Sequence, residues 1–116
     1  MAGYLTTHVL DTARGCPAEG LEIWLYRVSG NSHRKIAEAV TNADGRTEGP
    51  ILPEAKFKLG GYELVFRAGP YLDRVLPADA ARFLGDVPVR FAMDAAAHYH
   101  VPLLLSPYGY STYRGS

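Results

Sequence analysis

The sequence predicts an all-β fold, a β-sandwich of seven or eight short strands with one short helix. Apolar and polar residues alternate with period two in several short segments, which are rich in β-branched and aromatic residues. Turns that contain glycine or proline separate these segments. The length of 116 residues predicts one domain over 1–116, and the apolar fraction of 47% is ordinary for a globular protein.

Each strand follows from local alternation or from a bounding turn. In the first strand Leu5, Thr7 and Val9 share one face, and His8 shares the other face with Thr6. The predicted strands are Leu5–Asp11, Leu21–Val28, Arg34–Thr41, Gly61–Ala68, Val87–Met93, Tyr99–Leu105 and Tyr110–Arg114. An eighth, very short strand is allowed within 49–53.

The remaining segments are predicted to be loops, turns and the helix. Thr12–Gly20 contains two glycines and a proline and is predicted to be a loop. Asn42–Gly45 is a strong turn signal. Within 70–84, the stretch Pro77–Leu84 has a helix-favouring composition, so we expect the short helix there.

Composition excludes several classes of function. Twelve acidic residues balance twelve basic ones, so no net field attracts nucleic acid or an anionic membrane. The single Cys16 excludes an intramolecular disulfide and a cysteine-rich zinc site. We see no signal peptide and no peroxisomal address, and we therefore expect a cytoplasmic protein.

Alternation places histidines on outward faces. Tyr99 and Val101 belong to the more apolar set of their strand and should face the core, which turns His98 and His100 outward. His8 is outward on the first strand, so two strands offer histidines on what is predicted to be one sheet surface. No acid or cysteine accompanies them in the pattern, and we predict no metal site.

For other polar residues a simple structural interpretation competes with a functional one. A single histidine is usually a surface or structural group, and His33, beside a turn, is interpreted in this way. His98 stays ambiguous because it lies near a strand entry. Arg46, after an Asp-Gly turn, is either solvated or a fixed guanidinium that clamps two ligand oxygens. Arg114, in the crowded terminal segment, is equally open.

Longer motifs carry a family resemblance. The segments His8–Asp11, Gly15–Ala18 and Leu21–Ile23 resemble the transthyretin family, and the resemblance runs the full length of the chain. The segments His98–Pro107 and Tyr113–Ser116 are similar to its 5-hydroxyisourate hydrolase branch. The thyroid-hormone carriers of this family instead have lysine in place of the first histidine and threonine in place of His100, and they lack the terminal Tyr-Arg-Gly-Ser.

The resemblance implies an eight-stranded transthyretin-like sandwich, assembled as a homotetramer with sites at the dimer–dimer interface. It implies hydrolysis of 5-hydroxyisourate to 2-oxo-4-hydroxy-4-carboxy-5-ureidoimidazoline in urate degradation, with no cofactor or metal. One alternative is a non-catalytic carrier of the transthyretin type, which would not need the histidine and arginine set. Another is an adhesion module, which predicts aromatic patches on loops, whereas here aromatic residues concentrate in the last strands.

The resemblance also assigns site residues. The matching positions are catalytic His8, Arg46, His100 and Ser116, and substrate-binding His8, Arg46, Tyr113 and Arg114. We favour His100 as general base, because an imidazole with a pKa near 6.5 suits this role, with His8 positioning water or returning the proton. The reverse assignment stays open. Arg46 would stabilise the oxyanion. Tyr113 would contact the substrate ring across the interface, and Ser116 would orient a histidine or the water.

Overall fold

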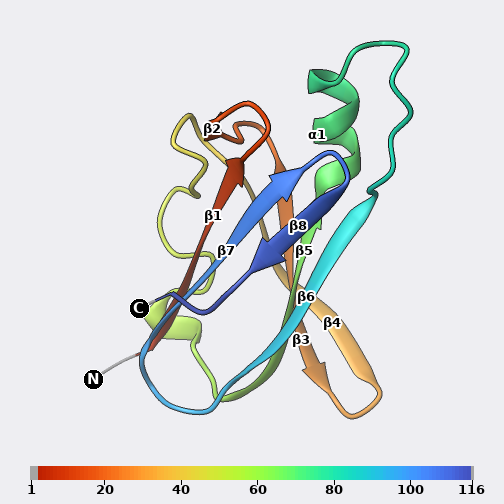
Figure 1. Ribbon diagram of the computed structural model, residues 1–116. Helices are drawn as coiled ribbons and strands as arrows, with labels where there is room; N and C mark the ends of the chain where they lie inside the picture. The colour runs from red at the N-terminus through yellow and green to blue at the C-terminus, as the bar shows by residue number, and fades with distance from the viewer. Residues whose placement is uncertain (1–2, 116) are drawn as a thin grey trace.

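The computed structural model describes residues 3–115, which form two four-stranded sheets packed face to face (Figure 1). The strands are β1 Tyr4–Asp11, β2 Cys16–Pro17, β3 Glu22–Ser29, β4 Ser32–Val40, β5 Gly60–Arg67, β6 Asp86–Met93, β7 His98–Ser106 and β8 Gly109–Thr112. Helix α1 spans Ala68–Val75, and a 3₁₀ turn, η1, spans Glu54–Lys56. The all-β sandwich with eight strands and one short α-helix is therefore confirmed for the described residues.

The sheets have the strand orders β2-β1-β7-β8 and β4-β3-β5-β6. All strand pairs are antiparallel except β1 and β7, which run parallel along their whole length. β2 lies inside the predicted loop and pairs with the end of β1. The segment 49–53 forms an isolated bridge, Leu5 with Leu52, rather than an eighth regular strand. The last strand ends at Thr112, two residues earlier than predicted.

The hydrophobic core lies between the two sheets. Along β1 the buried and half-buried residues alternate, as the period-two pattern predicts. The largest completely buried core side chains include Leu5, Leu25, Leu64, Phe66 and Leu103. Each such side chain contributes roughly 1.5–3 kcal/mol through burial, and together they hold β1 and β7 against the second sheet.

The predicted position of the helix was wrong. α1 follows β5 directly, whereas Pro77–Leu84 is irregular and almost entirely exposed. Pro70 lies in the first turn of α1, where its missing N–H breaks no helical hydrogen bond. Tyr71 and Leu72 are buried and dock the helix on the core, and this tertiary contact outweighs the higher helix propensity of the later segment.

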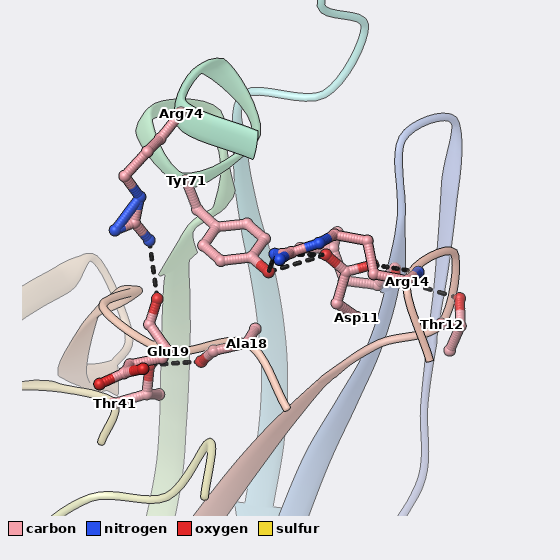
Figure 2. A network of polar contacts seen from close by, with 9 residues as sticks. Asp11, Thr12, Arg14, Ala18, Glu19, Thr41, Tyr71 and Arg74 are labelled. Carbon is pink, nitrogen blue, oxygen red and sulfur yellow. Dashed lines mark hydrogen bonds and ion pairs between the residues drawn. The ribbon is translucent and has the colours of Figure 1, made fainter. Parts of the chain in front are cut away.

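A buried polar network joins α1 to the end of β1 (Figure 2). The Tyr71 hydroxyl donates to Oδ2 of Asp11 at 2.7 Å, and the Arg14 guanidinium donates to the same hydroxyl at 3.4 Å. The backbone N–H of Arg14 donates to Oδ1 of Asp11 at 3.0 Å. Burial, together with the bond to Asp11, raises the pKa of Tyr71 to about 12. The network fixes one end of the strand that carries His8.

Candidate active site

The outward residues of β1 and β7 form one continuous surface because these strands are parallel neighbours. The register places Tyr4 opposite His98 and Thr6 opposite His100. These outward side chains are half-buried, whereas the inward side chains between them are buried. We call this surface the histidine face, defined by Thr6, His8, His98 and His100.

The structure brings the two predicted catalytic histidines together on this face. The ring centroids of His8 and His100 are 6.5 Å apart, and the ring planes are tilted by 36°. The positions follow from alternation on each strand and from the pairing of β1 with β7. The predicted shared surface is thus present, and both rings are partly accessible to a small molecule.

Arg46 is held beside His8 by the predicted turn. Its backbone forms an isolated bridge with His8. The side-chain oxygen of Asn42 accepts hydrogen bonds from the N–H groups of Asp44, at 2.9 Å, and of Arg46, at 3.2 Å. Gly45 has φ of 74°, and its carbonyl accepts a hydrogen bond from the Val9 N–H at 2.9 Å, in a place where a Cβ would collide with the Val9 carbonyl oxygen. The turn therefore fixes the backbone of Arg46 beside His8, and the positive charge of Arg46 acts on both His8 and His100.

Burial and neighbouring positive charge keep both histidines neutral. Burial lowers the pKa of His8, Arg46 lowers it further, and the Asp44 backbone and carboxylate oppose these effects in part. Burial also lowers the pKa of His100, and Arg46, His8 and His98 add to the shift. Both imidazoles are therefore mainly uncharged at pH 7, and a neutral imidazole can accept a proton.

The C-terminal segment is docked on β7. The Gly115 N–H donates to the His100 carbonyl at 2.6 Å, and the two residues form an isolated bridge. In Figure 1 the segment beyond β8 runs across β7 toward the start of β1. A Cβ on Gly115 would lie 2.8 Å from Cδ2 of His100, so the glycine allows the chain to pass close to the imidazole.

The other predicted site residues are not gathered on the histidine face of one chain. The Arg114 guanidinium stacks 4.3 Å from the ring centroid of Tyr99, a residue of the core-facing side of β7. Tyr113 is 56% exposed. Both line a cavity of about 340 Å³ that also contacts β6. Ser116, the remaining predicted residue, lies outside the described residues.

The sequence pattern does not single out Thr6, and it leaves His98 ambiguous. The Thr6 hydroxyl oxygen lies 2.7 Å from Nε2 of His98 and 2.8 Å from Nδ1 of His100. The His98 ring is stacked on Tyr4, with centroids 4.2 Å apart and planes 7° apart. The available signal was the outward polar position of Thr6. Its pairing with residues more than ninety positions away, however, depends on the β1–β7 register.

The histidine face offers imidazoles, a guanidinium and a hydroxyl, which are groups suited to proton transfer and oxyanion stabilisation. Among residues 3–115 no group of three or more His, Cys, Asp or Glu side chains is arranged to hold a metal ion. In the same part of the chain, no helix is long and apolar enough to cross a membrane.

Comparison with known proteins identifies the family. The model of the HIUase/Transthyretin family matches residues 5–115. The chain belongs to this family. Among its relatives, the 5-hydroxyisourate hydrolase of Mesorhizobium japonicum is 58% identical over an alignment of 117 positions, which covers 98% of this chain and 93% of that protein.

Solved structures of the HIUase/Transthyretin fold agree with this result. An (S)-allantoin synthase superposes with a TM-score of 0.88 at 46% identity, covering 98% of this chain and 44% of that longer chain. Transthyretin from Sparus aurata superposes with a TM-score of 0.85 at 26% identity, covering 96% of this chain and 95% of that protein. Proteins with these two different names share the backbone shape of this chain, so the fold alone does not decide its function, and the side chains of the site must be considered.

Proposed function

We propose that this chain is a 5-hydroxyisourate hydrolase, which opens the substrate ring to give 2-oxo-4-hydroxy-4-carboxy-5-ureidoimidazoline. The observation that carries the proposal is the convergence of His8, Arg46 and His100 on one face. The 58% identity to a 5-hydroxyisourate hydrolase supports it. A carrier would need neither a neutral imidazole pair nor the adjacent guanidinium.

The reaction follows from these groups. His100 takes a proton from water while the water oxygen bonds to the substrate carbonyl carbon. The carbonyl oxygen gains negative charge, and the planar donors of Arg46 stabilise it. Collapse of this intermediate re-forms the carbonyl and breaks the C–N bond of the ring. The leaving nitrogen receives the proton that His100 took from water, either directly from His100 or relayed through His8. The 6.5 Å between the ring centroids places both imidazoles near one small substrate.

We propose that the remaining predicted residues complete the site across a subunit interface. In one chain Arg114 stacks on Tyr99, on the opposite side of β7 from the paired histidines. In a homotetramer, arranged as a dimer of dimers, Tyr113 would contact the substrate ring across the interface, Arg114 would bind the substrate, and Ser116 would orient a histidine or the water. The single domain over 1–116 and the cytoplasmic location also stay predictions.

The test follows the ultraviolet absorbance of freshly generated 5-hydroxyisourate with and without the protein. The proposal predicts decay well above spontaneous hydrolysis, with a rate proportional to protein concentration. No acceleration would overturn it and leave the carrier alternative. For the assembly, light scattering should give about four times the 12.7 kDa chain mass, and a monomer would contradict the tetramer.

A further inference from the structure

Thr6 occupies an unusual place on the histidine face, because one hydroxyl joins two imidazoles. Its oxygen lies 2.7 Å from Nε2 of His98 and 2.8 Å from Nδ1 of His100, both within hydrogen-bonding distance. The backbone register places Thr6 directly opposite His100. The hydrogen bonds run from His100 through Thr6 to His98. Tyr4 stacks on the His98 ring and fixes its orientation. The three side chains are thus held in a defined order.

Counting protons shows that the two rings are coupled. A threonine hydroxyl has one proton to donate, and each neutral imidazole has one N–H and one bare nitrogen. If both contacts are hydrogen bonds between neutral groups, at most one ring can accept the single hydroxyl proton, so at least one ring must donate to the hydroxyl oxygen. Thr6 therefore links the tautomer of His98 to that of His100.

His100 can act as a base toward the substrate through Nε2 only if its Nδ1 donates to Thr6. If Nδ1 of His100 carries the proton and donates to Thr6, then Nε2 is bare. The hydroxyl is then free to donate to a bare Nε2 of His98. In the opposite arrangement Nε2 of His100 carries the proton, and its only lone pair accepts from the hydroxyl. A base that is oriented by a third group is the general pattern for this type of catalysis.

We propose that Thr6 and His98 are positioning residues, which hold His100 in the Nδ1–H tautomer and leave its Nε2 free to take the proton from water. The proposal rests on the proposed function, because it assigns His100 the role of general base. It also gives a role to His98, the third histidine of the face, whose ring centroid lies 6.3 Å from that of His100. His98 supplies the acceptor that directs the Thr6 proton away from His100.

The test uses isosteric substitutions in the full-length protein. Thr6→Val removes the hydroxyl and keeps the branched shape, and Thr6→Ser restores a hydroxyl. Thr7→Val is the matched control, because the hydroxyl of Thr7 lies on the other face of β1 and donates to the Val101 carbonyl at 2.8 Å. His98→Gln keeps an acceptor near the position of Nε2, and His98→Leu removes it.

The first readout is the tautomer of His100, from long-range ¹H–¹⁵N spectra of protein with labelled histidine. We expect the Nδ1–H form in the wild type, Thr6→Ser, Thr7→Val and His98→Gln. We expect a shift toward the Nε2–H form in Thr6→Val and His98→Leu. An Nε2–H tautomer of His100 in the wild type would overturn the proposal. This readout needs no activity, so it separates failure of the proposal from failure of the proposed function.

The second readout is the steady-state rate of 5-hydroxyisourate hydrolysis. Thr6→Val and His98→Leu should lower kcat about 10- to 100-fold, with KM changed by less than about twofold, because the base rather than substrate binding is affected. The Ser, Gln and Thr7→Val variants should stay within about threefold of the wild type. Full kcat in Thr6→Val, with the spectra showing a folded protein, would also overturn the proposal.

Discussion

Two histidine clusters on opposite sheets have similar stacking but different polar partners. On the histidine face, His98 stacks on Tyr4 with a 4.2 Å centroid distance, and its Nε2 contacts the Thr6 hydroxyl. On the outer face of the second sheet, His33 stacks on Tyr26 at 4.1 Å. There the ring contacts a carboxylate. We call Tyr26, His33, Glu63 and Arg90 the His33 cluster.

The polar partner distinguishes His33 from His100, the proposed general base. Nε2 of His33 lies 2.7 Å from Oε1 of Glu63, and Arg90 donates to Oε2 at 3.2 Å. Burial alone would raise the pKa of Glu63, but the bonds from His33 and Arg90 outweigh burial and lower it. This carboxylate is ionised and satisfied. On the histidine face the partners are a hydroxyl and Arg46, and there burial and positive charge lower the pKa of His100.

The largest expected difference between the two clusters is in catalysis. His100→Asn should lower kcat by about 100- to 10,000-fold, because the general base is lost. His33→Asn should leave kcat within about twofold of the wild type, since His33 lies on the other sheet. Both are measured from 5-hydroxyisourate absorbance decay. Equal losses of kcat in the two variants would contradict a catalytic role that is specific to the histidine face.

Removing the charge of Arg46 should give the next largest effect. Arg46→Gln should reduce kcat/KM by about 100- to 1,000-fold, because the oxyanion loses its planar donors. Arg46 also lowers the pKa of His8 and His100. Without its charge, the acidic limb of the kcat/KM profile should move to higher pH. Arg46→Lys keeps the charge and should keep the limb in place while still losing activity. A limb that moves equally in both variants would contradict this explanation.

Much of the histidine face could be predicted from the sequence, because period-two alternation alone orients His8, His98 and His100 outward. The hydroxyl contact between Thr6 and the two rings could not, because it depends on the register of two strands that are distant in sequence. The helix was misplaced for a related reason. Composition favoured Pro77–Leu84, but only Ala68–Val75 has buried residues that dock on the core.

The close passage of the C-terminal segment can be tested with a single methyl group. Gly115→Ala should lower kcat on the order of tenfold, because its Cβ would lie 2.8 Å from the His100 ring and displace it. Gly109→Ala is the matched control, since its Cβ would approach only the Ser106 side chain, at 3.9 Å. Rates that do not differ between the two variants would show that the His100 ring tolerates this displacement.

The smallest effect on activity is expected in the His33 cluster. Glu63→Gln should leave kcat nearly unchanged but lower the free energy of unfolding by about 1–2 kcal/mol at pH 7, because two charged hydrogen bonds are lost. The lowered pKa of Glu63 means that its contribution is present above the ordinary value of 4.5 and is lost as pH falls through the lower folded-state value. Urea denaturation at pH 7 and at acid pH measures this difference. A constant difference at all pH values would contradict the ion-pair explanation.

The most direct test of the account is an NMR titration of the His100 ring. The central claim is that His100 is a neutral base at pH 7, since burial, Arg46, His8 and His98 all lower its pKa. The Cε1–H resonance should therefore titrate with a midpoint below the ordinary value of 6.5, and kcat/KM should fall along the same curve at acid pH. A midpoint at or above 6.5, or a rate that does not follow the titration, would contradict the account.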